Sequence, residues 1–190
     1  MEINNIILAI ANQFKEYYRY NVPKTKLLKL TYLAELEYKR KYNERLSDAK
    51  WVYFLYGPYL YEYNEILTNS DFEEEEIEDS IELEKMATFI EPKRNNKKEL
   101  TVDINMIITN IVAQYGGNKL DDLLEYIYFE TEPMMKAETR GEYLNFDVVM
   151  NSEYYKIRAL HIEKDIENSL RNNFRKKLEQ INAKRNAGYL

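Results

Sequence analysis

The stretch that decides the fold is KTKLLKLTYLAELEYKRKY, residues 24–42. Apolar side chains recur on one side of a helix with 3.6 residues per turn, whereas Leu28 and Leu36 fall outside that face. The members of the main face are Leu27, Leu30, Leu33, Ala34 and Tyr38. Because apolar side chains point to more than one side, we expect a central helix with several neighbours and a mainly α fold.

A further apolar stripe precedes this helix. Residues 3–19 repeat apolar side chains at spacings of three and four, which predicts a first helix with one buried face. Pro23 suits the first turn of the helix that follows, because its missing N–H group is tolerated there.

Helical spacing also occurs in three segments after the central helix. They are residues 59–68, 104–115 and 119–132. Asp103 and Asn118 are candidate N-caps of the last two, which Gly116–Gly117 separates. Pro133 limits the last helix, and residues 134–150 have no clear period.

Two short apolar runs have the character of strands. Residues 51–55 form an aromatic and β-branched run that ends at a Gly57–Pro58 turn. Residues 86–90 resemble a second strand. We expect these runs to pair, which gives a compact helical domain with a small sheet of two or three strands.

The end of the chain is polar and strongly helical in pattern. Residues 152–185 carry apolar side chains at steps of four, which predicts a long helix that crosses the domain or a partner obliquely. The expected organisation is a domain over residues 1–150 and a C-terminal polar helix within residues 151–190.

The net charge of −6 comes from one segment. Residues 71–84 contain nine acidic side chains and no basic one, whereas the remainder has a slight basic excess. We interpret this segment as a solvated loop or a patch that steers a basic partner. An acidic chain is a poor non-specific binder of nucleic acid, because phosphate neutralisation dominates that affinity.

The location of the chain follows from what it lacks. It contains no Cys, no apolar run of about 20 residues, and no signal-peptide pattern at residues 1–5. We expect a cytoplasmic protein without a membrane segment.

Reactive side chains are scarce. The single histidine, His161, cannot make a zinc site of the usual kind without Cys or a second His, and no phosphate-binding glycine loop is present. We therefore expect neither an enzyme nor a bound cofactor or metal. A carboxylate-based metal enzyme is the least favoured alternative, because the acidic run lacks the spacing of a calcium loop.

The chain contains 18 tyrosines in all, and several aromatic residues lie close together in the sequence around Gly57–Pro58. Such side chains are favoured at protein interfaces. The candidate partner-binding residues are Trp51, Tyr56, Gly57, Pro58, Tyr59 and Tyr61, with Met134, Met135 and Arg140 as a second patch. The alternative is that these side chains fill the core.

Three pieces of the sequence occur in the same order as three motifs of a known protein family. Lys26–Ala34 has the form Lys-Leu-x-Lys-Leu-x-Tyr-x-Ala, Trp51–Tyr59 is an aromatic strand that runs into Tyr-Gly-Pro, and Leu123–Pro133 ends in a Thr-x-Pro turn. Residues 1–135 thereby resemble the Panacea domain, the SocA-like antitoxin family. The third piece departs from the pattern, since many members carry a His and a Pro-Trp pair there.

The resemblance implies an antitoxin that binds and neutralises a cognate toxin protein, either by masking it or by delivering it to a protease. It does not identify the toxin or the oligomeric state. Two alternatives are a nucleic-acid-binding regulator that uses basic residues between positions 171 and 185, and a phage protein that counters host defence.

Overall fold

The computed structural model describes residues 1–78, 86–150, 171–179 and 182. At its centre is α2 (Lys24–Tyr42), which confirms the predicted central helix. Every residue of α2 from Leu27 to Leu36 is buried. These residues make almost three turns, so neighbours cover the helix on all sides along this length.

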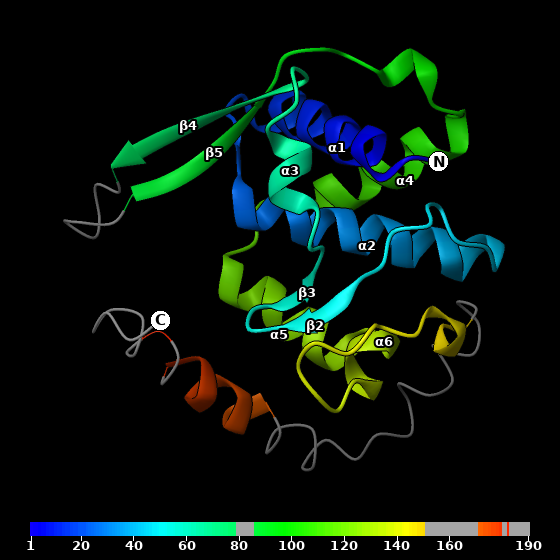
Figure 1. Cartoon of the computed structure of the whole chain (residues 1–190), viewed down its shortest axis with the longest axis vertical. Coiled ribbons are helices and arrows are strands. Elements are labelled where there is room, and N and C mark those ends of the chain that lie inside the picture. The colour runs from blue at the N-terminus through cyan, green and yellow to red at the C-terminus, as the bar shows by residue number, and fades with distance from the viewer. Residues whose placement is uncertain (79–85, 151–170, 180–181, 183–190) are drawn as a thin grey trace.

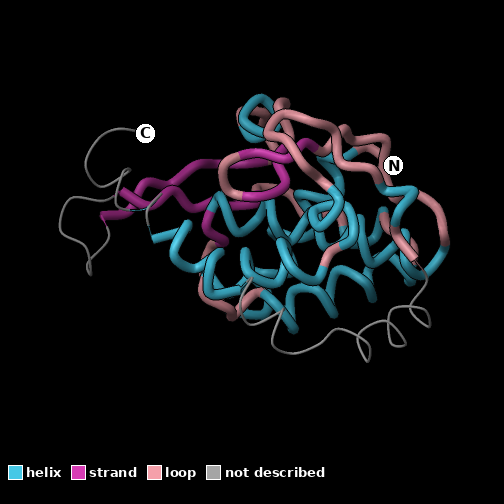
Figure 2. The backbone as a smooth tube through the Cα atoms, turned by 90° about the horizontal axis from the view of Figure 1, so that it is seen from below, coloured by secondary structure: helices cyan, strands magenta, loops and turns pink. Residues whose placement is uncertain are grey.

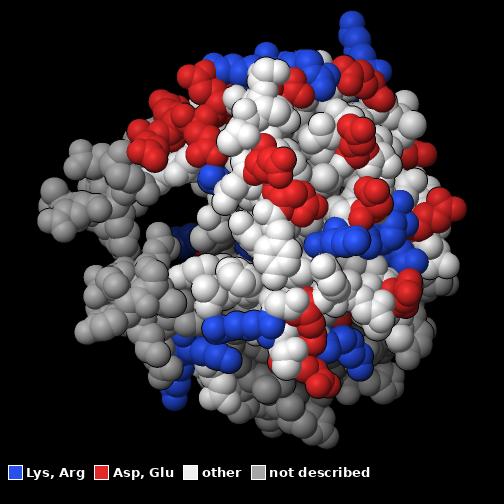
Figure 3. Space-filling model, viewed as in Figure 1, with Lys and Arg blue, Asp and Glu red and all other residues white. Residues whose placement is uncertain are grey.

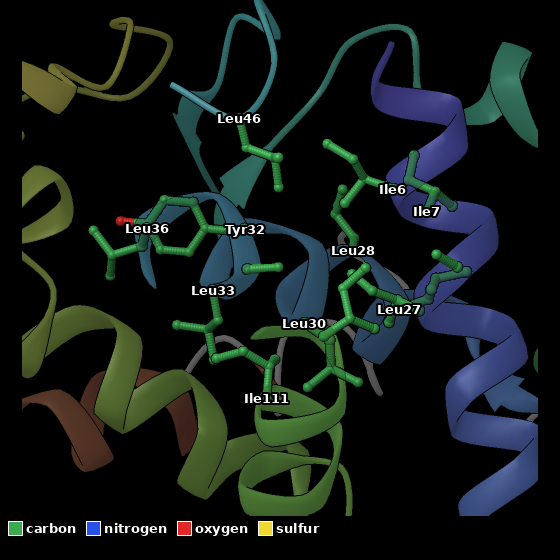
Figure 4. Packing of buried hydrophobic residues seen from close by; sticks show 14 of the residues in the cluster. Ile6, Ile7, Leu27, Leu28, Leu30, Tyr32, Leu33, Leu36, Leu46 and Ile111 are labelled. Carbon is green, nitrogen blue, oxygen red and sulfur yellow. The ribbon is translucent and has the colours of Figure 1, made fainter. Parts of the chain in front are cut away.

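Two other helices supply much of that cover. α1 (Ile3–Tyr18) and α4 (Val102–Tyr115) contact α2 and each other. Figure 4 shows Leu28 of α2 directed toward Ile6 of α1 and Leu33 directed toward Ile111 of α4. Each such side chain contributes about 1.5 to 3 kcal/mol when fully buried, so this three-helix contact is the main core.

The residues that cap the helices differ in part from the predicted ones. α1 and α2 each end at a residue with a left-handed backbone, Arg19 (φ 67°) and Asn43 (φ 57°). Thr101, and not Asp103, caps α4 by accepting a hydrogen bond from the Ile104 N–H. α5 (Leu120–Glu130) follows Lys119 without a side-chain cap, so the proposed cap at Asn118 is also wrong.

The predicted pairing of residues 51–55 with 86–90 is wrong. β2 (Val52–Phe54) pairs with β3 (Gly57–Tyr59) in an antiparallel hairpin whose loop is Leu55–Tyr56. Gly57 and Pro58 are therefore strand residues and not the turn itself. A two-residue loop costs little closure entropy, which favours this local partner over a distant one.

A separate antiparallel sheet has the order β1-β5-β4. It contains β1 (Val22–Pro23), β5 (Met86–Pro92) and β4 (Phe72–Glu78). Figure 2 shows most helices in one layer, with the strands and many loops along one side of it.

In the described part of the acidic segment, residues 72–78 form a strand and not the expected loop. β4 and β5 make an arm that extends from the helices in Figure 1, and Figure 3 shows acidic side chains gathered on it. Lys24 Nζ lies 2.7 Å from a Glu74 oxygen, and Lys93 pairs with Glu73 and Glu91. Strand pairing and these cations offset the repulsion between neighbouring glutamates.

The remaining described elements are short. They are α3 (Tyr63–Leu67), α6 (Glu132–Lys136) and the 3₁₀ turns η1 (Lys97–Glu99) and η2 (Phe146–Val148). The helix expected from residue 59 begins only at Tyr63, because Tyr59 belongs to β3. Met134 lies in α6, so the irregular segment begins later than predicted.

The long C-terminal helix is not confirmed. Residues 171–179 are helical, whereas residues 151–170, including His161, lie outside the described residues. The helical piece packs on α5 through Phe174, whose ring centroid lies 4.6 Å from that of Tyr128 and 5.1 Å from that of Phe129. No helix in the described part of the chain has the length and apolar character to cross a membrane.

Candidate functional site

The candidate site is the corner formed by the β2–β3 hairpin, the start of α2 and α3. Lys29 of α2 connects its two main parts, because its Nζ donates a 2.7 Å hydrogen bond to the Pro58 carbonyl oxygen. This bond joins the two sequence pieces that are most characteristic of the chain, the Lys-Leu-x-Lys-Leu helix and the Tyr-Gly-Pro strand.

Lys29 is unusual because the whole side chain is buried. Burial disfavours the ammonium form and lowers the pKa of Lys29 to about 7. Sequence reasoning missed its role. The available signal was a lysine between Leu28 and Leu30, on a helix that has apolar side chains on several sides.

Gly57 sets the path of β3. Its φ of +82° lies in the left-handed region that favours glycine. A Cβ at this position would lie 3.6 Å from both Leu124 Cδ2 and Tyr128 Cε2, so the strand passes directly over α5. The conformation at Gly57 therefore fixes how the hairpin lies on the helices.

The outer surface of the hairpin is aromatic. The ring centroids of Phe54 and Tyr59 are 5.5 Å apart, and those of Tyr59 and Tyr61 are 6.2 Å apart. Tyr61 is 58% exposed, and Phe54 is also exposed. Figure 3 shows an uncharged surface over this hairpin with acidic residues beside it. Two exposed aromatic rings thus flank the half-buried ring of Tyr59.

Two of the predicted corner residues point inward. Trp51 is 1% exposed and packs edge to face on Tyr32 of α2, with ring centroids 5.4 Å apart. The Tyr56 hydroxyl is buried and has no hydrogen-bond partner among the described residues. Trp51 therefore supports the corner from below, in agreement with the core alternative for this residue.

The residues of the second predicted patch, Met134, Met135 and Arg140, do not share one surface. Met134 is buried and Met135 is exposed, although both lie in α6. Arg140 is exposed and precedes Gly141, whose N–H donates a 2.7 Å hydrogen bond to the Tyr53 carbonyl oxygen. The structure thus brings Arg140 to the hairpin, and it buries Met134 in the core.

A pocket of about 350 Å³ lies beside the aromatic surface. Its lining includes Leu28 and Lys29 of α2, Phe54 and Tyr59 of the hairpin, and Asn64 of α3. Neither Phe54 nor Asn64 was predicted as a site residue. Asn64 joins the site because α3 lies beside the start of α2, where the Tyr63 hydroxyl donates a hydrogen bond to the Lys24 carbonyl oxygen, and Phe54 joins it from the hairpin.

A larger groove of about 860 Å³ runs between α2, α4 and α5. Its lining includes Arg40, whose hydrogen bond to Glu132 holds the pKa of the guanidinium above its usual value despite the opposing effect of burial. The groove carries side chains of both charges and lies away from the hairpin aromatics. Among the residues that the structure describes, no group of three or more metal-binding side chains comes together.

The two arginines of the C-terminal piece, Arg171 and Arg175, are engaged within the chain. Arg171 and Arg175 donate hydrogen bonds of 3.1 and 3.0 Å to the two oxygens of Glu125. These arginines hold the pKa of Glu125 below its usual value, against the opposing effect of burial. They therefore already have an anionic partner in α5.

A family model described as "Antitoxin SocA-like, Panacea domain" matches residues 27–133, which is more than half of the 190-residue chain. Comparison with the curated proteins and with the solved structures gives no match. The matched range includes Lys29, the β2–β3 hairpin and α5, whereas α1 and residues 171–179 lie outside it.

Proposed function

Because the chain belongs to the SocA-like antitoxin, Panacea domain family, we propose that it neutralises a toxin protein by direct binding. The family match over residues 27–133 is the observation that carries this proposal. The exposed aromatic surface of the corner supports it, because aromatic side chains on a rigid support are common anchors of protein interfaces.

Co-expression with the product of the neighbouring gene tests the proposal. The toxin alone is expected to arrest bacterial growth, and the chain is expected to restore growth and to copurify with the toxin. Normal growth with the neighbouring product alone, or no complex between the two proteins, would contradict the antitoxin function.

The corner is the proposed contact surface, and matched tyrosines test it. Tyr61→Ala is expected to weaken toxin binding about fivefold or more, because the loss of an aromatic anchor costs more than about 1 kcal/mol of binding free energy. Tyr17→Ala is the control, since Tyr17 is 54% exposed but belongs to α1, outside the corner. Calorimetry with purified toxin measures both; equal affinities would place the contact elsewhere.

The purified complex also distinguishes two modes of neutralisation. An inactive toxin in the isolated complex indicates masking. An active toxin in that complex, with growth restored only in cells that contain the relevant protease, indicates delivery for degradation.

Nucleic-acid binding has less support as a function. Arg171 and Arg175 pair with Glu125, and contact with phosphate would have to replace these ion pairs.

A further inference from the structure

The pocket at the corner combines apolar walls with basic groups. Leu28, Phe54 and Tyr59 provide apolar surface, and Lys24, Lys29 and Asn64 provide N–H donors. At about 350 Å³ it lies at the low end of the range for drug-sized ligands, roughly 300 to 1,000 Å³. This volume suits one or two side chains better than a large cofactor.

The charge of the lining is one-sided. The described residues that line the pocket include two lysines and no carboxylate. Lys24 Nζ already lies 2.7 Å from Glu74 Oε1, and Lys29 Nζ donates to the Pro58 carbonyl oxygen. Both the Lys24 ammonium and the Lys29 amino group have more N–H donors than these contacts use, so each can donate to a group that enters the pocket. The positive charge of the lining comes mainly from Lys24, because burial disfavours the charged form of Lys29.

The pocket adjoins the exposed surface of Phe54, Tyr59 and Tyr61. An interface commonly places its strongest anchor in a pocket and surrounds that anchor with contacts that exclude water. The hairpin aromatics are positioned to provide such surroundings on one side, and the exposed residues Thr25 and Asn64 form the rim on another.

On the premise of the proposed antitoxin function, we propose that this pocket binds one large apolar side chain of the toxin together with an adjacent toxin carboxylate. The apolar side chain packs between Leu28 and Phe54. The carboxylate accepts hydrogen bonds from the lysines at the wall. Charge complementarity with the Lys24 ammonium, and the lack of an acidic residue among the described residues of the lining, argue for this chemistry.

Blocking the pocket tests the proposal without removal of any side chain from the core. Asn64→Trp places a large ring at the exposed rim, and Asn110→Trp makes the same change at the exposed rim of the α2–α4–α5 groove. Calorimetry with the purified toxin is expected to show at least tenfold weaker binding for Asn64→Trp and less than twofold change for Asn110→Trp. Circular dichroism and melting temperature check the fold, and Thr25→Trp replaces Asn64→Trp if that variant does not fold.

A second variant tests the carboxylate. Lys24→Gln is expected to weaken binding about threefold to tenfold at low salt and to reduce the salt dependence of the affinity, because one ion pair with the toxin is lost. Equal salt dependence in Lys24→Gln and the wild type would overturn this part of the proposal.

The outcomes separate the pocket from the antitoxin function itself. If the wild type neither binds nor neutralises the toxin, the proposed function fails and the pocket proposal fails with it. If the wild type binds and Asn64→Trp binds equally well, only the pocket proposal is overturned. If Asn64→Trp instead converts the toxin-free chain from dimer to monomer, the pocket belongs to a second copy, which also overturns the proposal.

Discussion

At the scale of single residues, Lys29 makes folding depend on pH in an unusual range. Burial lowers the pKa of this ammonium to about 7 in the folded chain, against 10.5 as the ordinary value. Between these two values the unfolded chain binds the extra proton, so stability rises with pH through this window.

The test compares the wild type with Lys29→Met at pH 7 to 9.5. The free energy of unfolding of the wild type is expected to increase relative to the variant, by up to about 1.4 kcal/mol per pH unit. Urea unfolding measures the difference, and Lys50→Met, which removes an exposed lysine, is the control. A difference that stays constant across this pH range would contradict the buried, partly neutral lysine.

Gly57 tests the backbone of the corner. Gly57→Ala is expected to reduce the free energy of unfolding by about 1 to 3 kcal/mol, because an alanine is strained at φ +82°. Gly141→Ala is a matched comparison, since its φ is +89° and nothing lies within 4 Å of the added Cβ. We expect a similar loss of stability in both variants but weaker toxin binding only in Gly57→Ala, since Gly57 belongs to the proposed contact surface. Unchanged stability in Gly57→Ala would show that the hairpin does not hold this conformation.

At the scale of elements, the helical piece at residues 171–179 extends the chain beyond the family domain. Phe174 inserts between Tyr128 and Phe129, and Leu178 is buried. Tyr128 also lies under Gly57, so this piece supports the helix on which the corner rests.

Phe174→Ala measures that support. The variant is expected to lose about 1 to 2 kcal/mol of unfolding free energy, because a half-buried ring contributes part of the ~3 kcal/mol of a fully buried one. Lys176→Ala, on the exposed side of the same piece, is expected to change stability by less than about 0.5 kcal/mol. If both variants unfold at the same urea concentration as the wild type, the piece is not docked on α5 in solution.

At the scale of the whole molecule, the sequence predicted helices better than the pairing of strands. The periods of residues 3–19 and 24–42 are long and regular, so α1 and α2 are confirmed nearly to their ends. The predicted partner of β2 was wrong, because an apolar run indicates a strand but does not indicate which other strand it pairs with. β4 was missed for a related reason: its residues pair with β5 residues that lie further along the chain, from Phe72 with Pro92 to Glu78 with Met86, and the acidic run itself does not indicate that partner.

The candidate site was predictable only in outline. The aromatic residues near the Tyr-Gly-Pro piece lie together at the corner, where Tyr61 is exposed and Tyr59 is half-buried. That this corner binds a partner stays a prediction. Burial of Trp51 and Met134 follows from tertiary packing, which composition does not report. The pocket depends on three elements that meet only in the folded chain, so neither Lys29 nor Asn64 could be assigned to it from local sequence.

The glutamates of β4 have a consequence for solubility. β4 is an edge strand of the described sheet, and an exposed strand edge is a template on which a second copy can pair and start a fibril. Two such arms placed edge to edge would align rows of negative charge at short distance. Mutual repulsion thus protects the strand edge from self-assembly, and high salt would weaken that protection.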